Sequence, residues 1–162
     1  GPTLMTRYLD AESPFFDEGG HRWLLTGDLG IIRASGTVEV RGRADDVIVS
    51  GGLSIAPGPV RRAVRSFEGV ADAWIMATPD EKWGHVVTAL VVPEQVPADS
   101  LEMAELGSAL REHTAARIGR AQAPRRVVAV EALPYLGFDK VDRAAAAQAA
   151  AEASGTEREW VR

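Results

Sequence analysis

The sequence predicts an α+β fold, in which a short sheet with packed helices follows a β-rich segment. From residue 47 onward, apolar stretches alternate in the order strand, helix, strand, strand, helix, strand, helix. Before residue 44 the chain consists of short apolar stretches between glycine-containing turns, which is typical of β structure. A charged cluster at residues 42–46 separates the two parts. We therefore expect one domain to end at Arg43, giving segments 1–43 and 44–162.

The β-rich segment contains three short strand candidates. Residues 23–25 and 31–32 are apolar and flank the turn-like stretch 26–30. Residues 38–40 alternate apolar and polar side chains, as a half-buried strand does. Residues 12–20 are predicted to form a loop.

The second part begins with a short β-branched run and a glycine turn, and then a helix that opens at Pro57. Proline is tolerated in the first turn of a helix. Val60 and Val64 share one face of this helix, and Arg61 is predicted to point into water. Ser100 is predicted to cap the next helix, and the residues after 153 are expected to fray. The further elements expected are strands at 70–77, 86–92 and 126–130, and helices at 100–118 and 142–153.

Composition excludes several classes of protein and site. The 162 residues contain no cysteine, which excludes disulfides and thiolate metal sites and is compatible with the cytoplasm. A net charge of -5 argues against nucleic acid as the main partner. No apolar run reaches the ~18 residues of a membrane span, and no secretory signal is visible. The three histidines are far apart in sequence, so no metal site is expected.

Four motifs occur in order along the chain: residues 26–30 (TGDLG), 42–52 (GRADDVIVSGG), 123–126 (APRR), and Leu133–Pro134 followed by Lys140. In this order and spacing they resemble the C-terminal part of adenylate-forming enzymes, which include acyl- and aryl-CoA synthetases, adenylation domains and luciferases. The resemblance implies that a carboxylic acid and ATP react to an acyl-adenylate and pyrophosphate. A small mobile lid domain then rotates, and coenzyme A attacks to form a thioester.

The resemblance assigns three residues to the nucleotide and the acid. Asp28 matches the aspartate that binds the ribose hydroxyls, and a carboxylate suits a cis-diol. Arg43 matches an arginine near the nucleotide. Lys140 matches the catalytic lysine that contacts the acyl carboxylate and the α-phosphate. The simpler alternatives are a turn at Asp28, a surface ion pair of Arg43 with Asp45 or Asp46, and a solvated lysine.

The resemblance also assigns the moving parts. Asp45 matches the hinge about which the small domain swings. Ser50, Gly51 and Gly52 match the loop that approaches coenzyme A during thioester formation, where paired glycines allow close backbone approach. The alternatives are a solvated turn and an ordinary glycine turn. Asp139 replaces the glycine that usually precedes the catalytic lysine in the family.

The family also implies partners that this chain does not contain. The phosphate loop for ATP and the glutamate for Mg²⁺ belong to a large N-terminal domain, of which residues 1–43 are expected to be the end. The fragment is therefore expected to be inactive alone. The motifs look most like o-succinylbenzoate–CoA ligases of menaquinone biosynthesis, with fatty-acyl- and aryl-CoA ligases as alternatives. A non-catalytic binding or regulatory module that retains the lid fold is the alternative of another class.

Overall fold

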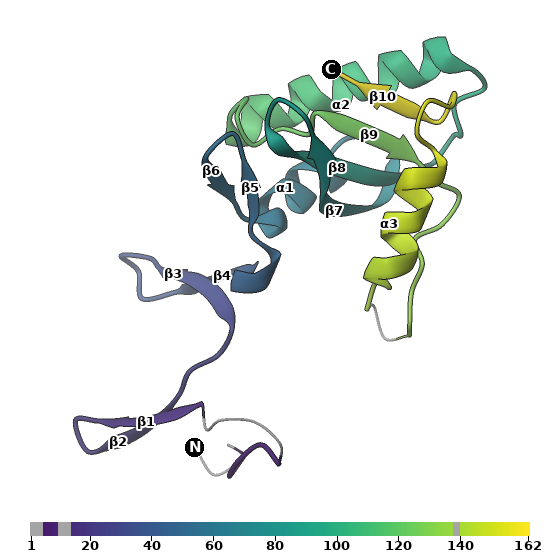
Figure 1. The fold of residues 1–162 in the computed structure, drawn as a ribbon. Helices are drawn as coiled ribbons and strands as arrows, with labels where there is room; N and C mark the ends of the chain where they lie inside the picture. Colours follow the sequence, from purple (N-terminus) through teal and green to yellow (C-terminus); the bar gives the residue numbers. More distant parts are fainter. Residues whose placement is uncertain (1–4, 10–13, 138–139) are drawn as a thin grey trace.

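The computed structural model describes residues 5–9, 14–137 and 140–162 (Figure 1). The strands are β1 (Phe15–Glu18), β2 (His21–Leu24), β3 (Asp28–Ile32), β4 (Val38–Arg43), β5 (Ile48–Ser50), β6 (Leu53–Ile55), β7 (Val70–Asp80), β8 (Gly84–Pro93), β9 (Arg126–Ala129) and β10 (Glu159–Val161). The helices are α1 (Pro57–Arg65), α2 (Ser100–Ile118) and α3 (Arg143–Glu152), with a short 3-10 helix, η1, at Ala44–Asp46. Within these residues, no helix has the length and apolarity to cross a membrane.

The body of the molecule is a four-stranded sheet in the order β10-β9-β8-β7. Strands β8 and β9 run parallel and are connected through α2, whereas the other neighbours are antiparallel. Helices α1 and α2 cover one face of the sheet and α3 covers the other. This arrangement confirms the predicted α+β fold.

The burial of β8 on both faces explains its largely apolar sequence. Val87, Ala89 and Val91 pack into the core beneath α1 and α2, whereas Leu90 packs into the core beneath α3. Successive side chains of a strand point to opposite faces, so a strand covered on both faces is apolar at most positions. The polar residue in its buried stretch, Thr88, is hydrogen-bonded to the Thr78 hydroxyl at 2.6 Å. Helix α3 can lie close to the sheet because its buried residues, Ala146 and Ala150, are small.

Several element ends differ from the prediction. Helix α2 is capped by Asp99 rather than Ser100, because the Asp99 carboxylate accepts hydrogen bonds from two backbone amides of the first turn, at 2.9 Å each. Strand β7 continues through Pro79 to Asp80. Proline is tolerated there because β7 is an edge strand of this sheet, so its missing N–H costs no ladder bond.

The C-terminal residues form a strand instead of fraying. Strand β10 pairs with β9, and Glu159 forms an ion pair with Arg126. The Trp160 ring lies against Gly107 of α2, where an added Cβ would come within 2.3 Å of the ring. The prediction failed because three residues carry too little local periodicity to reveal a strand whose partners are distant in sequence.

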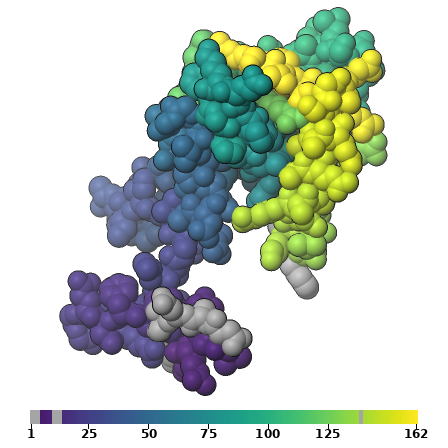
Figure 2. Space-filling view, viewed as in Figure 1, coloured from purple at the N-terminus to yellow at the C-terminus, as the bar shows by residue number. Residues whose placement is uncertain are grey.

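The N-terminal segment forms two hairpins, β1–β2 and β3–β4, that project from the body (Figures 1 and 2). Residues 12–20 were predicted to be a loop, but β1 lies within that range. Gly19 and Gly20 have positive φ angles of 60° and 75° and form the turn that brings β2 back onto β1.

Candidate functional site

The structure places Asp28 directly opposite Arg43. These residues are register partners in the β3–β4 hairpin, so their side chains lie on the same side of it. The Arg43 guanidinium reaches over Gly27, where an added Cβ would be 3.1 Å from Nη2. Both side chains are exposed. The hairpin thus exposes a carboxylate and a guanidinium side by side, where a ligand could contact both.

Arg43 also contacts Asp45, as the simpler sequence interpretation anticipated. Arg43 Nη2 lies 3.4 Å from Asp45 Oδ2, and the two side chains are 55% and 77% exposed. An ion pair this exposed contributes little stability, so the guanidinium can exchange it for a ligand. None of the three residues of η1 is buried. The backbone at Asp45 is therefore not held by core packing.

The loop Ser50–Gly51–Gly52 is a tight hairpin turn between β5 and β6. Ser50 is buried, and Gly51 and Gly52 have positive φ angles of 55° and 81°, as a two-residue hairpin turn requires. The Gly51 amide donates a hydrogen bond to the Trp83 carbonyl at 3.1 Å. The Arg125 guanidinium lies 4.1 Å above the Trp83 ring. The glycine turn is thus supported by the turn between β7 and β8.

Gly51→Ala and Gly52→Ala are expected to differ in stability although both residues have positive φ. A Cβ at Gly51 would lie 2.4 Å from Trp83 Cε3, whereas nothing lies within 4 Å of a Cβ at Gly52. Strain alone predicts a loss of about 1 kcal/mol for Gly52→Ala. The clash adds roughly 1–3 kcal/mol for Gly51→Ala. Urea unfolding of the two variants checks this, and equal losses would contradict the role of the Trp83 contact.

Lys140 lies in a small hairpin just before α3. Tyr135 and Val141 form a bridge across it, and the Leu136 amide donates to the Lys140 carbonyl at 2.8 Å. Leu133 and Val141 are buried beneath α3 and fix the base of the hairpin. The Lys140 side chain is exposed. Asp139, the departure noted in the sequence, lies outside the described residues.

The base of this hairpin is tied to the body through Asp72. The Tyr135 hydroxyl donates to the Asp72 carboxylate, which also accepts from Arg61 at 3.2 Å and pairs with Arg65 at 3.4 Å. Burial opposes ionisation, but the hydrogen bonds from Tyr135, Ala73 and Arg61 together lower the pKa of Asp72. The hydrogen bond to Asp72 and burial raise the pKa of Tyr135.

The prediction that Arg61 faces water was wrong. Its side chain is 31% exposed, and its Nε donates to the Ala73 carbonyl at 2.6 Å. The helical pattern correctly indicated which face of α1 is polar. It could not show that the Ala73 carbonyl and the Asp72 carboxylate of β7 lie beside Arg61.

Arg111 holds the APRR motif of residues 123–126 in place. Its buried guanidinium donates to the carbonyls of Ala123 at 2.9 Å and Pro124 at 2.5 Å. Burial, together with the charges of neighbouring arginines, lowers the pKa of Arg111 to about 10. These bonds fix the chain that leads into β9 and places Arg125 over Trp83. Sequence analysis missed Arg111, because an arginine within a long helix resembles a solvated residue.

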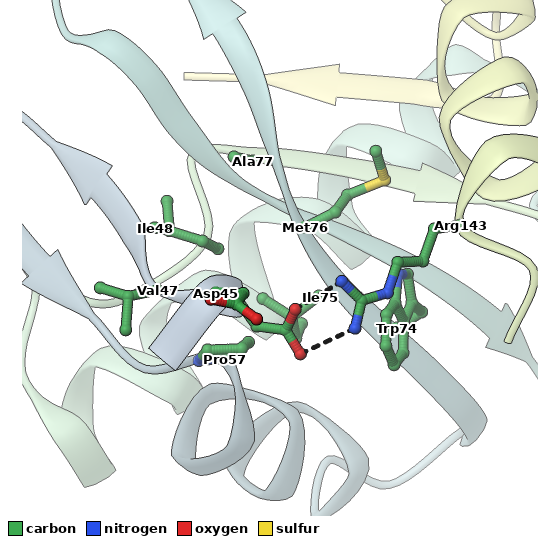
Figure 3. A pocket seen from close by; sticks show the side chains of 10 residues that line it. Asp45, Val47, Ile48, Pro57, Trp74, Ile75, Met76, Ala77 and Arg143 are labelled. Carbon is green, nitrogen blue, oxygen red and sulfur yellow. Dashed lines mark hydrogen bonds and ion pairs between the residues drawn. The ribbon is translucent and has the colours of Figure 1, made fainter. Parts of the chain in front are cut away.

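A further pocket adjoins η1 and was not anticipated. It lies between η1, β7 and the start of α3 (Figure 3). Arg143 reaches across it toward η1, and Trp74 and Met76 form its β7 wall.

The predicted site residues fall into three groups. Asp28, Arg43 and Asp45 are together at the β3–β4 hairpin and η1. The glycine turn lies at the end of the β5–β6 hairpin, and the Lys140 hairpin lies below α3, on the opposite side of the sheet in the view of Figure 1. The structure therefore presents the glycine turn and Lys140 on different sides of the domain.

Comparison with known proteins gives these groups a context. Residues 62–137 match the family model described as the AMP-binding enzyme C-terminal domain. A probable 2-succinylbenzoate–CoA ligase of Mycobacterium tuberculosis is 39% identical over 149 residues, covering 90% of this chain and 37% of that protein. The medium/long-chain-fatty-acid–CoA ligase FadD8 of the same species is 37% identical over 153 residues, covering 90% and 26%.

A solved structure shows the same architecture. The o-succinylbenzoate CoA synthetase of Bacillus subtilis, in complex with its acyl-adenylate intermediate, superimposes with a TM-score of 0.70 at 30% identity. The alignment covers 87% of this chain and 28% of that protein. The chain thus spans between 26% and 37% of the length of these relatives. It contains the small C-terminal domain of the adenylate-forming, AMP-binding enzymes.

Proposed function

We propose that this chain is the C-terminal part of an ATP-dependent acid–CoA ligase. The similarity to CoA ligases over 90% of the chain carries the proposal. In the first half-reaction a carboxylate oxygen of the acid attacks the α-phosphorus of ATP, and pyrophosphate leaves. In the second, the thiol of coenzyme A loses its proton and attacks the acyl carbon, and AMP leaves.

In the first half-reaction, Asp28, Arg43 and Lys140 each have a proposed role. Asp28 and Arg43 stand side by side and exposed, so one carboxylate can accept hydrogen bonds from a ribose diol while the guanidinium faces a phosphate or ribose oxygen. Lys140 brings an ammonium group on a hairpin that is held at its base and exposed at its side chain. There it offsets the negative charge that develops at the α-phosphate.

The separation of Lys140 from the glycine turn supports alternation between two orientations of the domain. Groups on different sides of one rigid body cannot enter one cleft in the same orientation. A rotation at Asp45, in an η1 segment without buried residues, would present Lys140 for adenylation and then Ser50–Gly52 for thioester formation. We accordingly propose Asp45 as the hinge and the Arg43–Ala44 peptide as the domain boundary.

The exposed apolar surface of the N-terminal hairpins supports a missing large domain. Leu25, Ile32, Val38 and Val40 are 60–77% exposed. Isolated two-stranded hairpins are marginally stable in water, so these faces are expected to pack against further strands. We propose that the large domain supplies them, together with the ATP phosphate loop and the glutamate that binds Mg²⁺. The metal would neutralise phosphate charge there.

For the acid we propose o-succinylbenzoate, which would place the enzyme in menaquinone biosynthesis. The relative and the solved structure that bear this substrate in their names align at 39% and 30% identity. Medium- and long-chain fatty acids are the second candidate, because the ligase for those acids aligns at 37%.

Pyrophosphate release by the full-length enzyme tests the function and the substrate together. The enzyme, with ATP and Mg²⁺, is incubated with o-succinylbenzoate, benzoate, and fatty acids of medium and long chain. We expect acid-dependent release with o-succinylbenzoate at the highest kcat/KM, and a CoA thioester when coenzyme A is added. Highest activity with a fatty acid would correct the substrate. No release with any acid would favour a binding or regulatory module.

A further inference from the structure

A bidentate ion pair connects η1 to the first residue of α3. Arg143 Nη1 lies 2.5 Å from Asp46 Oδ1, and Arg143 Nη2 donates to Asp46 Oδ2 at 3.0 Å (Figure 3). The two residues are 97 positions apart in sequence. The Asp46 side chain is only 19% exposed, whereas that of Arg143 is 58% exposed. Two parallel hydrogen bonds of this kind fix the relative orientation of the segments as well as their distance.

Each partner stands next to a residue of the proposed mechanism. Asp46 directly follows Asp45, the proposed hinge. Arg143 follows Lys140 by three positions. The pair therefore links η1 directly to the segment that carries Lys140.

The chain between Lys140 and Arg143 is stiff enough to transmit this contact. Val141 is buried and bridges Tyr135 across the hairpin. Asp142 caps α3 by accepting hydrogen bonds from the amides of Ala144 at 2.9 Å and Ala145 at 3.1 Å. A shift of Arg143 would therefore move the base of the hairpin with it.

We propose that Asp46 and Arg143 are a positioning pair that sets the place of Lys140 relative to the hinge. This inference rests on the proposed adenylation reaction. When the domain turns at Asp45, the pair makes Asp46, α3 and the lysine hairpin move as one unit, so the amine arrives at a defined position.

The test uses the full-length enzyme with Asp46→Asn, with Arg143→Gln, and with both substitutions. Asp46→Asn keeps the shape of the side chain, whereas Arg143→Gln shortens it, and each removes the charge pair. Because displacements near 1 Å can cost up to about a hundredfold in rate, we expect each variant to lose about tenfold or more in adenylation kcat. Adenylation is measured by acid-dependent ATP–pyrophosphate exchange, and thioester formation by supplying the acyl-adenylate and coenzyme A.

Three results are expected together. Thioester formation stays within about twofold of the unsubstituted enzyme, because Lys140 serves only the first step. The double variant loses no more than either single variant, because the two side chains act as one unit. Glu112→Gln, a substitution on α2 that removes the exposed 3.5 Å ion pair with Arg120, leaves both half-reactions unchanged.

Two other patterns would overturn the inference. Unchanged adenylation in the single variants would remove the positioning role. Equal losses in both half-reactions, with a lowered thermal unfolding midpoint, would reduce the pair to a general stabilising contact. No exchange by the unsubstituted enzyme with any acid would instead refute the proposed function, and the inference with it.

Discussion

Lys140→Ala is expected to slow acyl-adenylate formation by about a hundredfold or more, the usual cost of removing one group that stabilises transition-state charge. The side chain is exposed on a hairpin whose base is buried, so its removal creates no cavity. The loss should therefore appear in kcat for pyrophosphate exchange and not in the unfolding midpoint.

The control for Lys140→Ala is Lys82→Ala, which removes the same charge from another exposed position. Lys82 lies 5.5 Å above the Trp83 ring, in the turn that supports the glycine loop, so adenylation should be unaffected. Thioester formation from supplied acyl-adenylate should survive Lys140→Ala. If both half-reactions fell together, the lysine would not have the proposed role.

Asp45→Pro is expected to have the opposite effect, with adenylation largely retained and thioester formation reduced by about a hundredfold or more, because rotation becomes limiting. Proline locks φ near -65° and also restricts the residue before it, here Ala44. The peptide at the centre of η1 would then lose the freedom that a change of domain orientation needs.

Asp45→Ala separates loss of rotation from loss of the carboxylate. Alanine also removes the 3.4 Å contact with Arg43 but leaves the backbone free. We expect both half-reactions of this variant to stay within about threefold of the unsubstituted enzyme, since so exposed a pair contributes little. Stopped-flow measurement of each step checks the pair of variants. Normal thioester formation by Asp45→Pro would show that the hinge lies elsewhere.

The parts that sequence predicted well are those governed by local periodicity. The apolar runs that became β7, β8 and β9 and the long helix α2 all lie within a few residues of their predicted ranges. Such patterns reflect burial of one or both faces of an element, which the chain shows residue by residue. The motif GRADDVIVSGG indicated the family before any element was placed, because its spacing is specific.

Contacts between distant segments were not predictable in the same way. Arg61 lies against a β7 carbonyl, Arg111 binds the carbonyls before β9, and Arg143 pairs with Asp46. The sequence around each of these arginines does not indicate which distant residue it contacts. Strand β10 was missed for the same reason, since its stability comes from β9 and from Trp160 against α2.

Sequence alone therefore determined the order of the longer elements from α1 to α3 and the family of the C-terminal domain, since periodicity and motif spacing are local properties of a chain. Tertiary structure alone decided that Asp28 and Arg43 face each other, that the glycine turn and Lys140 lie on different sides of the domain, and that η1 is tied to α3. The physical reason is that ion pairs and register depend on how elements pack in space, and identical local patterns are compatible with many packings.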